Sequence, residues 1–114
     1  MEKPNLSIII VNFNTKDLLH DCLTSILNHV KGIDYEVVVV DNGSSDGSIE
    51  EIKNLKFKMQ SANWRTKLKI ILNKKNLGFA KANNQALRQA FGPSSGRGAT
   101  SYKLLLSFPR TLYQ

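Results

Sequence analysis

The sequence predicts an α/β fold, an open and mainly parallel sheet with helices on both faces, in the Rossmann-like doubly wound arrangement. Two apolar, β-branched runs, Leu6–Phe13 (LSIIIVNF) and Tyr35–Asp41 (YEVVVVD), are nearly continuous, as strands buried on both faces are. Strand-like and helix-like segments then alternate along the chain, which is typical of this class. About four strands and three helices are expected, an incomplete version of the architecture.

The segment between the two runs is expected to be a helix. Its apolar residues, from Leu18 to Val30, recur with a period near 3.6. Asn14 or Thr15 is placed to cap its start, and Gly32 suits its end. The resulting βαβ unit should have a right-handed crossover.

The later elements continue the alternation. Ser45, Asp46 or Ser48 could cap the second helix, and Ser48 would do so in a capping box with Glu51. In the third helix Phe79 is expected on the inward face with Ala82, Ala86 and Leu87. The predicted ranges are a helix at 46–58, a strand at 68–72, a helix at 79–91 and a strand at 102–108, in the sheet order 3-2-1-4.

Composition limits the class of protein. The 114 residues are 41% hydrophobic, so one globular domain is expected. Cys22 is the single cysteine, which excludes an internal disulfide and favours a reducing compartment. The first apolar run is too short for a signal peptide or a membrane span. A cytoplasmic location is expected, with membrane contact at most peripheral to the inner face.

Charge is divided unevenly along the chain. Residues 1–55 contain all nine acids and four Lys or Arg residues, whereas residues 56–114 contain twelve Lys or Arg residues and no acid. Such asymmetry is typical of a chain with an anionic partner, and equally of one half of a larger unit. No carboxylate after Glu51 is available to bind metal or act as a base.

Asp41 is the strongest candidate binding residue. It ends an apolar strand, at the edge of the sheet where open α/β folds bind ligands. Its carboxylate can accept a hydrogen bond from a nucleotide base, and Asn42 follows it directly. The alternative is a helix-entry loop, in which glycines allow the turn and Ser45, Asp46 and Ser48 act as caps.

The end of the first strand offers two amides. Neither the glycine-rich G-x-G-x-x-G fingerprint nor a P-loop follows this strand, which argues against NAD(P) enzymes and P-loop NTPases. Asn12 and Asn14 have side chains suited to a base or ribose. Asn14 is equally well explained as a helix cap.

The third strand–helix junction, residues 73–84 (NKKNLGFAKANN), is expected at the same edge. Its helix start and its lysines suit a phosphate, although the lysines are equally explained as solvated side chains. Asn83 projects from the apolar face, so its amide requires a partner, either the neighbouring loop or a ligand.

These three segments together resemble family 2 glycosyltransferases, especially the rhamnosyltransferase-like branch. The resemblance rests on SIIIVNFNTKDLLHDCLTSIL, EVVVVDNGSSDGS and NKKNLGFAKANNQAL in this order and spacing, and covers about residues 6–90. It implies a GT-A fold and inverting transfer from a nucleotide-diphosphate sugar to a glycan or lipid-linked acceptor. Residues 1–90 would form the donor-binding half. The implied nucleotide-binding residues are Asn12, Asn14, Asp41, Asn42, Asn76, Gly78, Phe79 and Asn83.

The resemblance ends in the tail, residues 91–114. Family members bind Mg²⁺ or Mn²⁺ through an aspartate after the fourth strand, and here Arg110 stands at that position. The tail is therefore interpreted as divergent, with a truncated or frame-altered product as the hypothesis. No metal ligand and no catalytic residue are assigned, and the chain alone is expected not to transfer sugar.

The expected ligand is a nucleotide-diphosphate sugar of the UDP, dTDP or GDP type. Nucleic acid is not expected as a partner. A homo-oligomer or a partner chain that completes the sheet is expected for so small a unit. The alternatives to a glycosyltransferase are a catalytically inactive nucleotide-binding module and an assembly subunit with an acidic partner.

Overall fold

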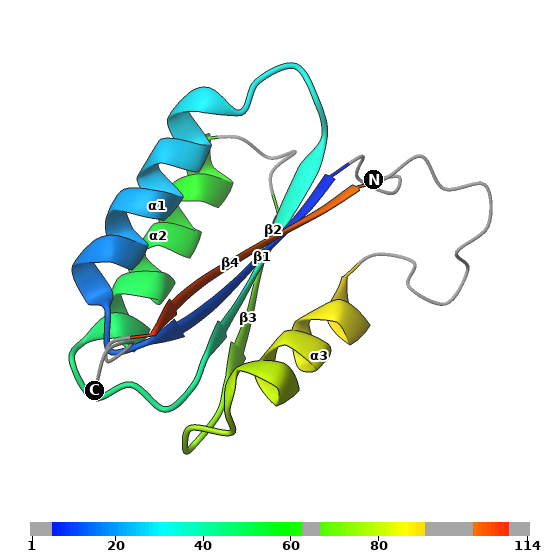
Figure 1. The fold of residues 1–114 in the computed structure, drawn as a ribbon. Coiled ribbons are helices and arrows are strands. Elements are labelled where there is room, and N and C mark those ends of the chain that lie inside the picture. The colour runs from blue at the N-terminus through cyan, green and yellow to red at the C-terminus, as the bar shows by residue number, and fades with distance from the viewer. Residues whose placement is uncertain (1–5, 63–66, 91–101, 110–114) are drawn as a thin grey trace.

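The chain forms a four-stranded sheet covered by helices on both faces (Figure 1). The computed structural model describes residues 6–62, 67–90 and 102–109. The elements are β1 (Leu6–Phe13), α1 (Lys16–His29), β2 (Tyr35–Asp41), α2 (Ser48–Ala62), β3 (Lys67–Leu72), α3 (Phe79–Gln89) and β4 (Tyr102–Pro109). The predicted division at residue 90 and the roles given to residues 91–101 and Arg110 fall outside the described residues.

The strand order is β3-β2-β1-β4, and all three pairings are parallel. The predicted order and direction are therefore confirmed. In this register Asn12 of β1 lies beside Asp41 of β2, and Asp41 lies beside Leu72 of β3. The carboxyl ends of these strands consequently meet at one edge of the sheet, which we call the carboxyl edge.

Two apolar layers hold the helices on the sheet. Helices α1 and α2 lie side by side on one face, and α3 covers the other (Figure 1). The first layer contains Ile8, Ile10, Val37 and Val39 with residues of α1 and α2, whereas Ile9, Val11, Val38 and Val40 pack against Ala82 and Ala86 of α3. Alternate residues of each strand thus serve opposite faces, which explains why both central strands are apolar throughout.

Helix α3 begins at Phe79, as predicted, but Phe79 does not face inward. Its side chain is 51% exposed. On this face of β2 the last apolar residue is Val40, and the next position is the polar Asn42. Ala82, in the same turn, is buried against the sheet, but Phe79 is not, so the predicted inward position of Phe79 is wrong.

Helix α2 begins two residues later than predicted, because Asp46 precedes the helix. The Asp46 Oδ1 atom accepts hydrogen bonds from the Ser48 N–H (3.0 Å) and hydroxyl (2.6 Å). The predicted capping box is wrong, since the Ser48 hydroxyl donates to Asp46 and Glu51 bonds His20 of α1. The other oxygen, Asp46 Oδ2, accepts the N–H of Lys16 at the start of α1 (3.0 Å). One carboxylate therefore joins the first turns of both helices.

A buried polar cluster lies under the far end of α3. Glu36 is 1% exposed, accepts a hydrogen bond from the Ser7 hydroxyl (2.6 Å) and pairs with Lys69 Nζ (3.0 Å). Lys69 also donates to the Gln89 carbonyl at the end of α3 (2.8 Å). The charge of this carboxylate is thus neutralised within the fold, and the cluster fixes α3 to β3.

Two loops of the carboxyl edge touch at Gly43. This glycine has φ +88°, and a Cβ atom placed on it would lie 2.9 Å from Lys75 Cα in the β3–α3 loop. Gly32 has a similar φ of +80° but has open space around it. A side chain at position 43 would therefore have both a backbone conformation that favours glycine and a clash, whereas one at position 32 would have only the first.

No helix in the described ranges is long and apolar enough to cross a membrane.

We predict that Gly43→Ala destabilises the protein more than Gly32→Ala. The expected losses in free energy of unfolding are about 1 kcal/mol for Gly32→Ala and on the order of 2–4 kcal/mol for Gly43→Ala, because the clash adds to the strain. Urea unfolding followed by circular dichroism measures both. Equal losses would show that the Gly43–Lys75 contact does not constrain the loops.

We also predict that Asp46 makes stability depend on pH. Partial burial raises the pKa of the Asp46 carboxyl, but the hydrogen bonds from Ser48 and from the Lys16 and Ser48 N–H groups outweigh it and lower the pKa below its ordinary value. Its stabilisation is therefore present above the pKa of about 4 of an unfolded chain and is lost as pH falls through the lower folded value.

The comparison of wild type with Asp46→Asn tests this dependence. Asp46→Asn should lower Tm at pH 7, and the difference from wild type should narrow as pH falls below about 4 and the wild-type carboxylate becomes protonated. Asp21→Asn, which removes an exposed charge from α1, is the control. A difference in Tm that stays constant across this pH range would contradict the role given to Asp46.

Candidate functional site

The carboxyl edge is formed by three loops, which follow β1, β2 and β3. The first contains Asn14, the second runs from Asn42 to Gly47, and the third from Asn73 to Gly78. Every residue predicted to bind nucleotide lies in one of these loops, at the strand end beside it or in α3. The structure shows how the loops are joined.

Asp41 is at the centre of the first junction. It is completely buried, and its Oδ1 atom accepts hydrogen bonds from Asn12 Nδ2 (2.9 Å) and from the Ser44 hydroxyl (2.7 Å). Its Oδ2 atom accepts the Ser44 N–H (2.8 Å). Both carboxylate oxygens are thus used within the protein, and the Ser44 side chain lies against the carboxylate.

Asn14 joins the first two loops from the other side. Its φ is +54°, a left-handed conformation that asparagine tolerates better than most residues. Its side-chain carbonyl accepts the Ser45 N–H (2.8 Å), and its own N–H donates to the Ser44 hydroxyl oxygen (2.9 Å). Asn14 therefore positions a loop, and it does not cap α1. Thr15 precedes α1 but donates its hydroxyl to Asn12 Oδ1 (2.7 Å).

Asn42 joins the second loop to the third. Its Nδ2 atom donates to Asn76 Oδ1 (3.0 Å) and the Gly78 carbonyl (3.3 Å). Its Oδ1 atom accepts from Asn73 Nδ2 (3.0 Å) and the Leu77 N–H (3.2 Å). Asn42 is 2% exposed, and its two donors and two acceptor positions are all occupied. This amide orders the β3–α3 loop.

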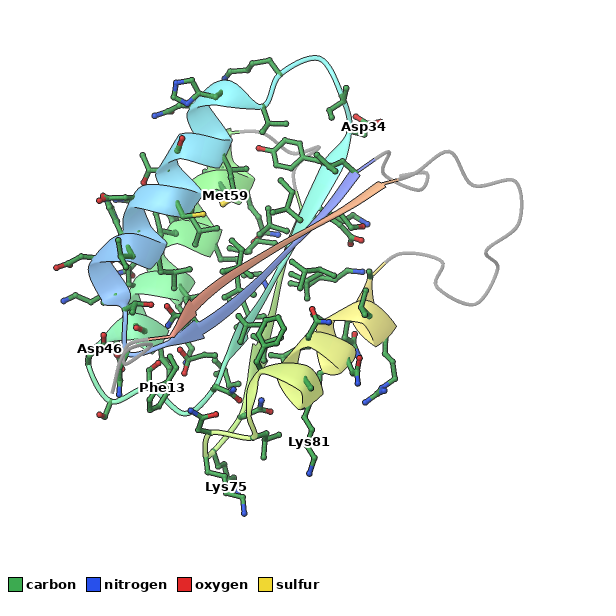
Figure 2. All side chains as sticks on the ribbon, in the orientation of Figure 1. Phe13, Asp34, Asp46, Met59, Lys75 and Lys81 are labelled. Atoms are coloured by element: carbon green, nitrogen blue, oxygen red, sulfur yellow. The ribbon has the colours of Figure 1, made fainter. Side chains whose placement is uncertain are left out.

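The N-terminus of α3 differs from that of α2. Gly78 precedes α3 with φ +89°, no side chain caps the helix, and its first turn contains no acid. Lys81 lies in this turn, and Lys74 and Lys75 lie in the loop before it. All three lysines are exposed, and the Lys75 and Lys81 side chains point away from the body of the protein (Figure 2). Helix start and lysines together give this part of the edge a positive potential.

Asn83 lies about one turn into α3. Its Oδ1 atom is buried and has no hydrogen-bond partner. The amide therefore does not pin the neighbouring loop through this oxygen, which was one of the two roles expected of it. A buried acceptor of this kind is costly unless a partner reaches it.

A shallow hollow opens beside the first two loops. It has a volume of about 300 Å³ and is lined by Asn14, Thr15, Lys16, Asp17, Leu18 and Asp46. Leu18, expected in the apolar row of α1, is 56% exposed here. The hollow lies next to the Asp41 network, and Asp46 marks its position in Figure 2.

The possible metal ligands of the described residues do not form a cluster. Within residues 6–62, 67–90 and 102–109, no group of three or more His, Cys, Asp or Glu side chains is arranged to hold a metal ion. Asp41 and Asp46, the carboxylates at the edge, accept hydrogen bonds from the loops and helix starts. The described donor set therefore does not fit Mg²⁺ or Mn²⁺, which require several oxygen ligands.

Three residues that shape the site had no predicted role. Ser44 contacts Asp41, and Asn73 exchanges two hydrogen bonds with Gln85 of α3 (2.8 and 2.9 Å). Ser44 stands in a serine-rich turn and Asn73 directly after a strand, positions at which polar residues are ordinary. Their partners are 3 to 12 residues away or on another loop, and no local spacing identifies them.

The chain matches the glycosyl transferase family 2 over residues 7–94. An uncharacterised glycosyltransferase of Bacillus subtilis (strain 168), YfnE, is 34% identical over 86 residues, 75% of this chain and 20% of that protein. A poly(ribitol-phosphate) beta-glucosyltransferase of Bacillus spizizenii is 35% identical over 57 residues, 49% of this chain and 9% of that protein. The chain thus spans about a fifth or less of the length of these relatives.

Two solved structures share the fold. The mannosyltransferase PcManGT from Pyrobaculum calidifontis, in complex with GDP-Man and Mn²⁺, has a TM-score of 0.64 and 27% identity over 79% of this chain and 25% of that chain. S. aureus TarS has a TM-score of 0.68 and 25% identity over 90% of this chain and 16% of that chain. The family match covers well over half of the sequence, and the parallel sheet agrees with these neighbours. The chain belongs to glycosyl transferase family 2 and has part of the GT-A fold.

Proposed function

We propose that this chain binds the donor, a nucleotide-diphosphate sugar, for an inverting glycosyltransferase that acts on a glycan or lipid-linked acceptor. The observation that carries the proposal is the convergence of three loops at the carboxyl edge, joined through Asp41 and Asn42. Open α/β sheets bind ligands at this edge. The GDP-Man in the PcManGT complex supports a nucleotide sugar as the ligand.

In this proposal the residues of the edge have different tasks. A carboxylate offers about four acceptor positions, and Asp41 uses three of them within the protein. The Ser44 hydroxyl turns away, and Asp41 then accepts a base N–H. Asn12 and Asn14 hold the first loop on the base side. Asn42 orders the third loop without touching the ligand, because its amide is fully occupied.

The diphosphate is placed at the start of α3. The first turn of this helix is free of acids and uncapped by a side chain, with Gly78 at the junction and exposed lysines beside it. The first turns of α1 and α2 already receive the Asp46 carboxylate. Asn76 and Phe79 line the approach to α3, and both are exposed. The unpartnered Oδ1 atom of Asn83 accepts a hydrogen bond from a hydroxyl group of the nucleotide sugar.

The Mn²⁺ in the PcManGT complex supports a divalent metal in the wider family. The described donor set of this chain does not fit such an ion, so its ligands are placed outside the described residues. We derive no step of the reaction through a metal. The chain would then supply nucleotide contacts, and the remaining groups would come from other parts of a complete enzyme.

Nucleotide binding is the first test. Isothermal titration calorimetry with UDP, dTDP and GDP should detect binding of at least one of them. Asp41→Ala should weaken it by about 1–3 kcal/mol, the range for a hydrogen bond to a charged group. Because Asp41→Ala also removes buried hydrogen bonds, circular dichroism must show that the variant is folded. Asn76→Ala should also weaken binding, and it needs the same check, because Asn76 Oδ1 accepts hydrogen bonds from Asn42 Nδ2 and from the Gly78 N–H.

Asp34→Ala is the matched control for Asp41→Ala. Asp34 precedes β2 and lies at the opposite edge of the sheet (Figure 2), so its loss should leave affinity unchanged. Wild-type affinity in folded Asp41→Ala would remove Asp41 from the site. The absence of any nucleotide binding would favour the other alternative, an assembly subunit with an acidic partner.

Turnover is the second test. We expect the 114-residue chain alone not to transfer sugar from a panel of nucleotide sugars in the presence of Mn²⁺, because Asp41 and Asp46 are held within the fold and no described group of carboxylates is arranged to hold the metal. Binding without transfer is the expected result. A catalytically inactive nucleotide-binding module would give the same result. Robust transfer by the isolated chain would show that the base and the metal ligands lie within it.

A further inference from the structure

Helix α2 carries an exposed phenylalanine on the side opposite the core. Phe57 is 74% exposed, the largest value among the exposed large hydrophobic side chains of the described chain. The buried hydrophobic residues of α2 are Ile52, Leu55 and Met59. At 3.6 residues per turn, each of these three lies roughly 140–160° from Phe57 around the helix axis. The ring therefore points directly away from the sheet.

Lysines surround this ring. Lys56 and Lys58 lie about 100° to either side of Phe57, and Lys53 lies one turn earlier on the same side of the helix. Lys53 and Lys58 are exposed, and Lys56 is half-buried. We call these four residues, Lys53, Lys56, Phe57 and Lys58, the α2 basic face. The acids of α2, Glu50 and Glu51, are confined to its first turn.

The same end of the molecule is basic and apolar beyond α2. Helices α1 and α2 both end at the edge of the sheet opposite the candidate site (Figure 1). At this edge Lys31 and Lys67 are exposed, and Ile33 is 48% exposed. Of the two acids nearby, Asp34 is half-buried and Glu36 is buried against Lys69. The exposed acid Glu50 lies two turns before Phe57 on the same side of α2, so the excess of positive charge is confined to the part of the helix from Lys53 onward and to the end of the molecule beyond it.

We propose that the α2 basic face docks the protein on an anionic lipid surface. Phe57 would enter the headgroup region while the lysines contact lipid phosphates, the arrangement of helices that lie on a membrane. The apolar ring distinguishes this from attraction by charge alone, because a polyanion in water gives an exposed ring no apolar environment. The surface is separate from the loops of the candidate site, so the proposal stands whether or not the chain binds a nucleotide sugar.

Cosedimentation with vesicles tests the proposal on the full chain. Vesicles of phosphatidylcholine with about 30% phosphatidylglycerol should bind the protein, and vesicles of phosphatidylcholine alone should not, because surface attraction requires anionic lipid. Phe57→Ser should weaken binding about tenfold, the value expected for one large apolar side chain. Replacing Lys53, Lys56 and Lys58 together with Gln should weaken it further.

Two matched variants separate this face from general attraction. Leu18→Ser removes an exposed apolar residue from α1, and replacing Lys74, Lys75 and Lys81 together with Gln removes the same charge from the opposite edge. Both should bind anionic vesicles nearly as well as wild type. Circular dichroism melts check that all variants fold. Phe57→Ser should fold as wild type does, because Phe57 is exposed.

Three results would overturn the proposal. The first is no binding to anionic vesicles. The second is equal loss in the two lysine triples, which would show attraction by net charge. The third is unchanged binding of Phe57→Ser, which would show that the ring does not enter the lipid and would favour an acidic macromolecule in solution as the partner of the lysines.

Discussion

The arrangement of the carboxyl edge depends on two consecutive polar residues at the end of β2. Because strand side chains alternate between faces, Asp41 lies on the α1–α2 side and Asn42 on the α3 side. Both are buried, and buried polar groups require partners. Asp41 finds them in Asn12 and Ser44, and Asn42 finds them in the third loop. A single strand end thereby fixes the positions of all three loops.

At the helix starts, too, one residue satisfies groups of two elements. One carboxylate, Asp46, satisfies N–H groups at the first turns of α1 and α2, so these positive ends are already neutralised. The start of α3 has no acid in its first turn and no side-chain cap. Of the three helix starts at this edge, α3 alone retains an uncompensated positive end. This contrast supports the proposal that a phosphate binds at α3, without reference to any single lysine.

The sequence predicted the fold well because the apolar runs of β1 and β2 are long enough to require burial on both faces. It also predicted the edge at which polar residues gather. It failed where a distant partner decides the outcome. Glu51 bonds His20 of α1, thirty-one residues away, and Asn42 forms four hydrogen bonds to residues more than thirty positions away. Local spacing carries no information on such partners.

The charges of the α1–α2 layer also bear on how the protein would sit on an anionic surface. The acids Asp17, Asp21 and Glu50 lie in the N-terminal halves of these helices, toward the carboxyl edge, and all are exposed. In the α2 basic face, Lys56, Phe57 and Lys58 lie in the C-terminal half of α2, and Lys53 lies just before its middle. An anionic surface attracts one half and repels the other, so the layer would tilt with its acidic half away from the lipid. The three loops would then face the solvent, where a soluble nucleotide sugar can reach them.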